Sequence, residues 1–408
     1  ESEGWILTDD VAGADVNLIN TCTVRPHAED RVWGALFELR ERARREPDLI
    51  IGVCGCMAQG KADYIARRCP WVRVICGTRA FDRLIALVAR AVEEGRTVID
   101  TDMSSGPCLA GLPRKRKSRL KAFIPVMRGC ENYCAYCIVP YVRGNEVSRP
   151  LKEVLSEVEA VARDGCREVM LLGQNVNSYR AEDVSFADLL REVASINGID
   201  RIRFMTSHPK EFPDDLIRAM AETPQICEHL HLPLQAGSDK ILEMMNRRYT
   251  FGSYRGLVRK IREAVPGISL STDIIVGFPG ETDDDFDMTV SALLEVRFDG
   301  VFVFKYSDRE GTRAVELQPH VPEDIIERRH AEILKLQEGV SAVRNGKLVG
   351  ETVEVLVEGY SPRNPNRLFG RTRTNKRVVF EGGGDLIGRL VCVIIRESTP
   401  LTLIGATV

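Results

Sequence analysis

The chain has 408 residues, a net charge of −3, and a composition that is 44% hydrophobic and 28% charged, as in ordinary globular proteins. At roughly 150 residues per domain, this length predicts two or three domains. The sequence has no apolar run near the roughly 18 residues of a membrane span, and its start lacks a signal-peptide pattern. We therefore expect a cytoplasmic protein whose 12 cysteines are metal ligands or catalysts, because the cytosol keeps thiols reduced.

The first part of the chain, residues 1–112, opens with ESEGWILTDD and lacks an initiator methionine, so we expect that a preceding segment is missing. Apolar runs then alternate with helix-like segments, as in DVNLIN, EDRVWGALFELRER and LIIGVC. This alternation predicts an α/β domain with a parallel sheet covered by helices. A basic stretch over residues 113–121 predicts a linker, which is either simply solvated or holds phosphate beside a nucleic-acid site.

A second alternating pattern covers residues 122–343. Its apolar runs are AFIPVM, EVMLLG, RIRFMT, EHLHLP, STDIIVG and GVFVFKY. Six strand–helix units predict a (β/α)6 partial barrel of the TIM type, in which the chemistry lies at the carboxyl ends of the strands. The loops at those ends carry polar residues, as in RGCENYC, GQNVNSY, SHPK, QAGSD, GFPGE and SDREGT.

The last part of the chain, residues 344–408, changes to strands with a period of two, separated by Asn, Pro and Gly. This pattern predicts a small antiparallel, OB-like β-barrel. The segment contains ten basic and six acidic residues, a net charge of +4. A basic small barrel is a common form of RNA-binding domain.

Three cysteines lie close together in MRGCENYCAYCIVP, where Cys130, Cys134 and Cys137 have the spacing C-x3-C-x2-C. Structural zinc needs four ligands, so a zinc site would need a distant Cys or His to complete it. A [4Fe-4S] cluster held by three thiolates keeps one iron open for a substrate or cofactor. The position of this loop after the first barrel strand favours the iron–sulfur interpretation.

This cysteine motif, in this predicted barrel, resembles the radical S-adenosylmethionine (SAM) superfamily. Further stretches make the resemblance narrower: NTCTVRPHAED, GVCGCMAQG, LLGQNVNSY, RIRFMTSHPKEF, LHLPLQAGSDKILEMMNRRYT and STDIIVGFPGET. Together they resemble the radical SAM methylthiotransferases along the whole chain, and most closely their MiaB branch. The resemblance implies that the C-terminal barrel is a TRAM domain, which binds RNA.

The resemblance also implies two [4Fe-4S] clusters. The first is held by Cys130, Cys134 and Cys137 and binds SAM through its open iron. The auxiliary cluster is held by Cys22, Cys56 and a third cysteine before ESEGW, so it would be incomplete in this sequence. Both Cys22 and Cys56 follow predicted strands, at the edge where α/β ligand sites form. Cys54 and Cys76 are less favoured substitutes, and the remaining cysteines are expected to be small buried or loop residues: Cys69, Cys108, Cys166, Cys227 and Cys392.

Several other residues fall at or near the strand ends, where they would contact SAM or the nucleotide or order their own loops. They are Gln174, Asn175, Ser207, His208, Gln235 and Arg247. The resemblance also implies that Gly277, in DIIVGFPGE, packs near the adenine of SAM. His229 and His231 are expected to be buried histidines with hydrogen-bond partners, and the core is expected to contain Met127, Met244 and Met245.

The function that this resemblance implies is the addition of a methylthio group to C2 of N6-isopentenyladenosine at position 37 of tRNA. The expected partners are the anticodon stem-loop, SAM and an electron donor such as a flavodoxin or ferredoxin, with no membrane and a monomeric chain. One alternative is a related methylthiotransferase that acts on threonylcarbamoyladenosine in tRNA or on a ribosomal protein. Another is an RNA-binding protein with structural metal sites.

Overall fold

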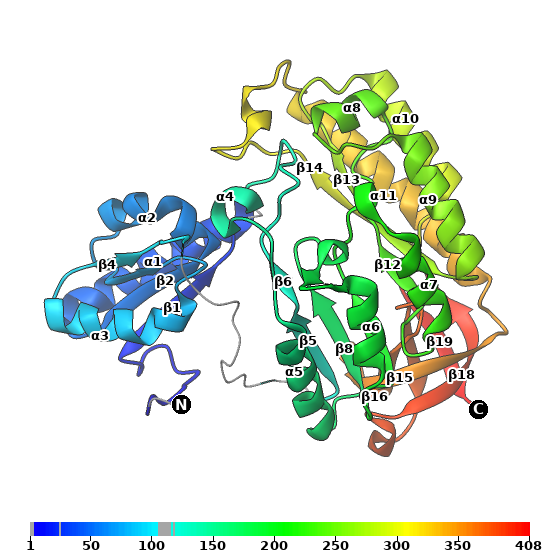
Figure 1. Cartoon of the computed structure of the whole chain (residues 1–408), viewed down its shortest axis with the longest axis horizontal. Coiled ribbons are helices and arrows are strands. Elements are labelled where there is room, and N and C mark those ends of the chain that lie inside the picture. The colour runs from blue at the N-terminus through cyan, green and yellow to red at the C-terminus, as the bar shows by residue number, and fades with distance from the viewer. Residues whose placement is uncertain (1–3, 24–25, 105–115, 117–118) are drawn as a thin grey trace. The chain divides into compact units, whose positions relative to one another are not determined.

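The structure, a computed structural model, describes residues 4–23, 26–104, 116 and 119–408. The chain forms two compact units (Figure 1). One contains residues 1–115, 128–147 and 309–312, and the other contains residues 116–127, 148–308 and 313–408. Most of the predicted linker at residues 113–121 lies outside the described residues, as does Cys108.

The first unit contains a four-stranded parallel sheet in the order β1 (Val16–Thr21), β2 (Ile50–Gly55), β3 (Val74–Cys76) and β4 (Val98–Asp100). Helices α1 (Pro26–Arg45) and α2 (Cys56–Arg68) pack on one face through a core that includes Leu36, Met57 and Val53. The alternate strand residues pack against α3 (Leu84–Glu94), which follows the short helix η1 (Phe81–Arg83). The predicted helix-covered parallel sheet is confirmed.

The second unit contains two three-stranded parallel sheets (Figure 1). One consists of β5 (Lys121–Pro125), β8 (Glu168–Leu172) and β11 (Arg201–Phe204), and the other of β12 (His229–His231), β13 (Ser269–Val276) and β14 (Gly300–Lys305). Backbone hydrogen bonds from Ile202 to Gln225 (2.7 Å) and from Cys227 to Ile202 (3.0 Å) join the two sheets. All six strands predicted for this region are therefore present, and neighbours in sequence are neighbours in space.

Helices lie between these strands in the chain. They are α5 (Leu151–Arg163), α6 (Phe186–Ala194), α7 (Asp214–Glu222), α8 (Asp239–Met244), α9 (Phe251–Ala264), α10 (Asp283–Val296) and, after β14, α11 (Glu323–Gly346). Short elements complete the connections: η2 (Val176–Ser178), β9 (Arg180–Ala181), β10 (Val184–Ser185), η3 (Pro209–Glu211) and η4 (Arg313–Glu316).

Alternate strand residues pack with the helices in one core, for example Ile124 on β5, Leu171 on β8 and Ile274 on β13. Successive side chains of a strand point to opposite faces. The intervening residues therefore form a second face, which we call the inner face. It includes Lys121, Phe123, Glu168, Arg201, Arg203, His229, His231, Ser271, Asp273 and Phe302.

The C-terminal strands form a closed five-stranded barrel in the ring order β15 (Thr352–Ser361), β16 (Asn364–Thr372), β17 (Arg377–Glu381), β19 (Leu403–Thr407) and β18 (Leu390–Ser398), with η5 (Gly384–Leu386) between β17 and β18. The prediction of an antiparallel barrel is wrong for one pair, because β17 and β19 are parallel. A closed ring with an odd number of strands cannot alternate in direction throughout, so one parallel pair is unavoidable.

This barrel is attached to the amino ends of the six parallel strands. Arg201 on β11 donates to the carbonyl of Arg371 at 2.7 Å, and Arg203 donates to the carbonyls of Thr372 and Arg373 at 2.7 and 2.8 Å. In return, Lys376 contacts Asp299 at 2.7 Å. Some of the basic residues that suggested RNA binding therefore hold the barrel in place.

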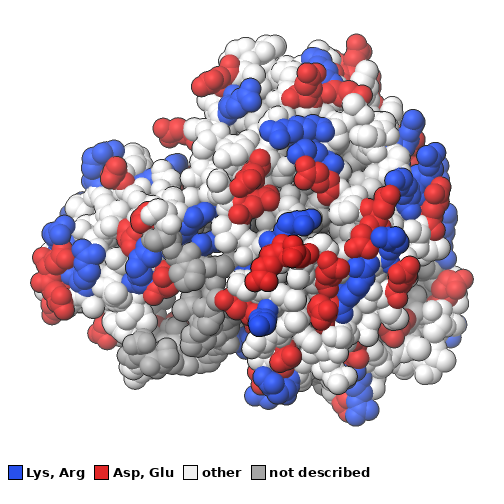
Figure 2. Space-filling view, viewed as in Figure 1, with Lys and Arg blue, Asp and Glu red and all other residues white. Residues whose placement is uncertain are grey.

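The surface carries charges of both signs. On the face drawn in Figure 2, described acidic and basic side chains are interspersed over both units. Within the described residues, each helix is too short or too polar to cross a membrane.

Candidate functional site

The segment with the three clustered cysteines belongs to the first unit and runs from β6 (Met127–Arg128) through α4 (Val139–Arg143) to β7 (Val147–Ser148), and β6 and β7 form a two-stranded sheet. Gly129 has φ +80°, and a Cβ there would lie 2.0 Å from the carbonyl oxygen of Asn145. Only glycine fits this close approach. Cys130 N–H donates to the carbonyl of Gly144 at 3.2 Å, and Cys137 N–H donates to that of Cys134 at 2.9 Å. The backbone therefore folds the three cysteines into one compact loop.

The thiols of this loop are not in disulfides. Cys134 is buried, whereas Cys130 and Cys137 are half-buried. Burial raises the pKa of the Cys130 thiol, although the amide of Asn132, which donates to its sulfur at 3.4 Å, acts in the opposite direction. Binding of a metal by the thiolate would offset this effect of burial. Within the described residues, no three His, Cys, Asp or Glu side chains are close enough together to bind a metal ion. The donor set and its glycine-fixed loop nevertheless fit a [4Fe-4S] cluster with three cysteine ligands.

Cys22 and Cys56 lie at the carboxyl edge of the first sheet. Thr21 on β1 is paired with Gly55 on β2, and the two cysteines follow directly, Cys22 exposed and Cys56 buried at the start of α2. Gly55 has φ +99°, and a Cβ there would lie 2.5 Å from the carbonyl oxygen of Thr21. The prediction that both cysteines follow strands at one edge is confirmed.

Cys54 and Cys76 are placed differently. They are paired across β2 and β3, and both side chains lie in the core under α3. Burial raises the pKa of Cys54 to about 11 and that of Cys76 to about 12. These two thiols behave as core residues, as do Cys69, Cys166 and Cys227, whereas Cys392 is exposed.

Charged residues beside Cys22 escaped the sequence analysis. Glu29 on α1 forms an ion pair with Lys61 at 2.7 Å and lies 4.0 Å from Arg309. Burial lowers the pKa of Arg309, while the neighbouring Glu29 and Cys22 act to raise it. Glu29 lies in the motif NTCTVRPHAED, so its position near Cys22 could have been predicted from the sequence. Arg309 is far from Cys22 in the sequence, so its position could not.

In the second unit, Gln174, Ser207 and His208 follow the carboxyl ends of β8 and β11. Ser207 and His208 are buried, and within the described residues neither Ser207 Oγ nor His208 Nε2 has a hydrogen-bond partner. Lys210 N–H donates to His208 Nδ1 at 3.1 Å, so Nε2 carries the proton of the neutral ring. Burial lowers the pKa of His208 to about 2. Ser207 Oγ and His208 Nε2 are thus two buried polar atoms at the same edge of the sheet.

The loop containing His208 is fixed by Asn177, which the sequence analysis did not single out. Its amide accepts from His208 N–H at 2.7 Å and donates to the His208 carbonyl at 3.1 Å. Asn177 is in the polar loop GQNVNSY. The sequence therefore predicted its position at a strand end but not its contacts with His208.

Gln235 lies on the loop that follows β12, and Arg247 lies after the next helix, between α8 and α9. Gln235 has φ +75°, and its backbone bonds to Asp273 and Ile275 on β13 at 2.8 and 3.0 Å. Arg247 is buried, donates to Tyr249 Oη at 2.9 Å and to the carbonyl of Pro233 at 3.2 Å, and stacks 5.2 Å from the Tyr249 ring. These contacts order the loop.

Gly277 ends β13 with φ +75°, and a Cβ there would lie 2.4 Å from Ile326 Cγ1. Its N–H donates to Glu281 at 2.7 Å, and Arg329 holds the same carboxylate at 2.7 Å. Burial raises the pKa of Glu281 in spite of these contacts. The turn therefore needs glycine, and it is fixed by a buried ion pair that the sequence did not reveal.

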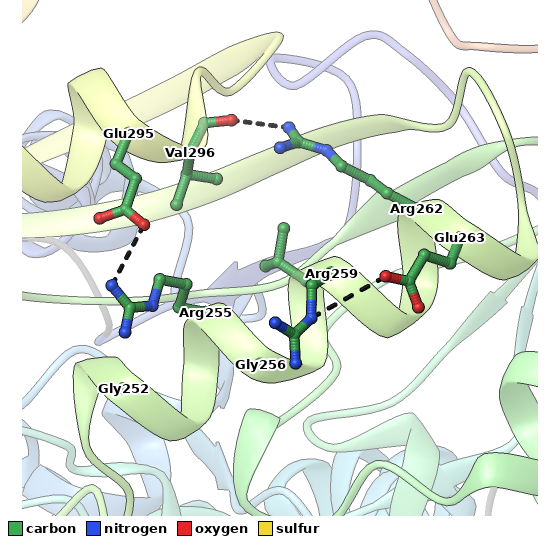
Figure 3. Close-up of a pocket in the computed structure, with 9 residues that line it drawn as sticks. Gly252, Arg255, Gly256, Arg259, Arg262, Glu263, Glu295 and Val296 are labelled. Atoms are coloured by element: carbon green, nitrogen blue, oxygen red, sulfur yellow. Dashed lines mark hydrogen bonds and ion pairs between the residues drawn. The ribbon is translucent and has the colours of Figure 1, made fainter.

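A cavity of about 620 Å³ lies elsewhere, along α9 and the end of α10 (Figure 3). Its arginines already have partners: Arg255 contacts Glu295 at 3.4 Å, and Arg262 donates to the carbonyl of Val296 at 2.6 Å. None of the predicted site residues lines it. We therefore regard it as a surface groove of the outer helices.

Comparison with known proteins gives matches along the whole chain. Three family models match in succession, described as Uncharacterized protein family UPF0004 (residues 1–77), Radical SAM superfamily (residues 124–293) and TRAM domain (residues 346–408). A tRNA-2-methylthio-N(6)-dimethylallyladenosine synthase from Carboxydothermus hydrogenoformans is 45% identical over 414 residues, which are 100% of this chain and 94% of the relative. A relative of the same name from Acetivibrio thermocellus is 46% identical over 410 residues, 99% and 85% of the two chains.

Among solved structures, the radical S-adenosylmethionine methyltransferase TsrM from Kitasatospora setae, with cobalamin and a [4Fe-4S] cluster bound, matches with a TM-score of 0.57 at 18% identity. The match covers 74% of this chain and 63% of that one. At this identity the likeness concerns the fold alone.

Proposed function

We propose that this chain, which belongs to the tRNA-2-methylthio-N(6)-dimethylallyladenosine synthase family of radical SAM enzymes, adds a methylthio group to C2 of N6-isopentenyladenosine at position 37 of tRNA. The observation that carries the proposal is the 45% identity to a relative of that name over the full length of the chain. The enzyme acts on tRNA and uses a [4Fe-4S] cluster and SAM.

The cysteine loop provides the site for the cluster that binds SAM. When bound, the cluster and SAM supply a radical able to break a C–H bond that no side chain can deprotonate at neutral pH. Cys130, Cys134 and Cys137 are the three protein ligands, and the loop bonds between Cys130 and Gly144 fix their spacing. The partial burial of the thiols keeps water away from the site.

Cys22 and Cys56 hold a second, auxiliary [4Fe-4S] cluster in our proposal. Their common position at one sheet edge supports this role. Cys54 and Cys76 are not its third ligand, because their side chains lie in the core beneath α3.

Gln174, Ser207, Gln235, Arg247 and Gly277 are proposed to form the SAM site. Ser207 Oγ, together with the neighbouring His208 Nε2–H, offers a buried polar group without a partner among the described residues. Gly277 allows the left-handed turn after β13 that packs against Ile326, and Arg247 acts by holding the Pro233 loop.

The finer organisation of the enzyme is also proposed. The domains are residues 1–112, the linker 113–121, a (β/α)6 partial barrel at residues 122–343 and the TRAM domain at residues 344–408. The order of the six parallel strands supports the partial barrel. We further propose a cytoplasmic monomer that takes electrons from a flavodoxin or ferredoxin.

The function is tested with Cys130→Ala in the full-length, anaerobically reconstituted protein. We expect at least a 1,000-fold loss of SAM cleavage and a loss of about four irons per chain, since one cluster site is removed. Cys392→Ala, which changes an exposed thiol on β18, is the matched control and should behave as the unaltered protein.

Mass spectrometry of tRNA nucleosides tests the substrate. A strain that lacks the gene should lose methylthiolated isopentenyladenosine and regain it with the unaltered gene but not with Cys130→Ala. Unchanged nucleosides would exclude this substrate, and SAM cleavage by Cys130→Ala would exclude the assigned cluster ligands.

A further inference from the structure

The middle of the inner face contains a polar group that the proposed SAM site does not use. His231 on β12 is paired in register with Ser271 on β13, and Asp273 on β13 is paired with Phe302 on β14. Val301 and Val303, on either side of Phe302, pack against the helix-covered core. Phe302, and with it Asp273, His231 and Ser271, therefore lies on the opposite, inner face.

These side chains form a chain of contacts. His231 Nδ1 lies 3.1 Å from Ser271 Oγ, and His231 Nε2 lies 3.4 Å from Asp273 Oδ2. The imidazole is only 6% exposed, whereas the Asp273 side chain is 25% exposed. His231 is thus the buried residue with partners that the sequence predicted, and Asp273 is the outer member, with a carboxylate oxygen accessible from the inner face.

Asp273 also has an apolar neighbour on this face. Phe302, its register partner, is 54% exposed, and its ring centroid lies 5.8 Å from that of His231. Phe123 on β5 is also on the inner face and is 61% exposed. Phe123 and Phe302 lie on β5 and β14, the two outermost of the six strands, and both expose their rings on the inner face, where an apolar group of a ligand can pack.

The position along β13 separates this group from the proposed cofactor site. Asp273 precedes Gly277 by four residues, which corresponds to about 13 Å at 3.3 Å per residue. A ligand that contacts Asp273 therefore lies deeper along the strands than one that packs on the Gly277 turn.

We propose that Asp273 binds the target base by accepting a hydrogen bond from its N6–H, while the alkyl branch on N6 packs on Phe302. This inference rests on the proposed function. An N6-alkylated adenine has one N–H donor directly beside an apolar group. Asp273 can accept from this N–H, and the exposed ring of Phe302 beside it can contact the apolar group. Hydrogen bonds to an ionised acceptor are stronger than those between neutral groups. His231 is a positioning residue, because it orients the carboxylate and contacts Ser271 behind it.

The test measures the affinity of the full-length, reconstituted protein for two anticodon stem-loop RNAs. One contains N6-isopentenyladenosine, and the other contains N6-methyl-N6-isopentenyladenosine, which has no N6–H. The unaltered protein should bind the first about 10- to 100-fold more tightly, the factor expected for a hydrogen bond to a charged group. Asp273→Ala should bind both RNAs equally, and Asp273→Asn, which keeps the size of the side chain, should lose most of the preference.

Asp287→Asn, a change at an exposed position on α10, is the matched control and should keep the preference. His231→Gln should weaken binding of the first RNA without lowering the turnover of bound RNA. If Asp273→Ala keeps the full preference, or if the unaltered protein shows none, the inference is wrong. If the unaltered protein binds with this preference but methylthiolates neither RNA, the proposed function fails and the role of Asp273 in base binding stands.

Discussion

The two ends of the six parallel strands in the second unit use buried polar residues in different ways. At the amino ends, Arg201 and Arg203 are 0% and 1% exposed, and both Nη atoms of each guanidinium have partners in the C-terminal barrel. At the carboxyl ends, Ser207 and His208 are 3% and 7% exposed, but Ser207 Oγ and His208 Nε2 have no partner among the described residues. Polar groups at the amino ends bind the C-terminal barrel, and those at the carboxyl ends belong to the proposed SAM site.

Electrostatics separate the two ends as well. Burial acts to raise the pKa of Glu168 at the start of β8, but Arg203 and Lys121 outweigh it and the pKa is lowered. At the carboxyl end, burial lowers the pKa of His208 to about 2, and the nearby Arg247 acts in the same direction. Charged partners thus outweigh burial at Glu168, whereas at His208 they act in the same direction as burial.

Arg203→Met is expected to give the largest loss of stability of the substitutions that test this comparison. Arg203 Nε donates to Glu168 at 2.9 Å, and both residues are almost fully buried. Removing one partner leaves a buried charge, which destabilises proteins by about 3–5 kcal/mol. Urea unfolding should show this loss, while SAM cleavage per folded molecule stays unchanged.

The double variant Arg203→Met with Glu168→Leu should recover much of the stability, since an apolar pair can replace a buried ion pair. Arg328→Met, which removes an ion pair whose side chains are 59% and 74% exposed, is the control and should change little. A selective loss of SAM cleavage in Arg203→Met would show that the amino ends also serve the chemistry.

A smaller effect is expected from acid, and here the two ends should behave alike. Burial lowers the pKa of His208 to about 2 and that of His229, at the amino end of β12, to about 3. The unfolded chain binds these protons near pH 6.5 whereas the native chain does not, so stability is lost as the pH falls below about 6.5. Each histidine should cost about 2 kcal/mol at pH 5 relative to pH 7.5.

Urea midpoints of His208→Asn and His229→Asn at the two pH values measure this cost. Each variant should lose about 2 kcal/mol less on acidification than the unaltered protein does. The exposed His320→Asn is a control and should show the ordinary acid loss. Identical pH dependence in all four proteins would show that neither buried histidine resists protonation.

Much of this arrangement could be predicted from the sequence, because it depends on local periodicity. The six strands of the central region and the carboxyl-edge positions of Cys22 and Cys56 followed from short apolar runs and from the residues after them. The parallel pair β17 and β19 could not be predicted from period-two strands, since strand direction depends on how the ring closes.

Contacts between distant residues escaped prediction for the same reason. In the sequence, Arg203 is one of the polar residues that alternate with apolar ones in RIRFMT. Its partners, the carbonyls of Thr372 and Arg373, are about 170 residues away in the chain. Arg309 beside Cys22 and Arg329 beside Glu281 are likewise separated from their partners by many residues. Which strand-end polar residues remain without partners follows only from the packed structure.

The smallest effect, and the most direct contrast between the two kinds of buried polar group, is expected from a pair of serine substitutions. Ser207→Ala removes a buried hydroxyl that has no partner among the described residues, so stability should not fall, whereas a lost hydrogen bond to SAM should weaken its binding about 10-fold. Ser341→Ala on α11 removes a hydroxyl that accepts from Gln337 at 2.9 Å, so it should cost about 1 kcal/mol of stability and leave SAM binding unchanged. Calorimetric titration with SAM and urea unfolding of both variants separate these outcomes. A stability loss in Ser207→Ala with unchanged SAM affinity would mean that the carboxyl ends, like the amino ends, use their polar groups for folding.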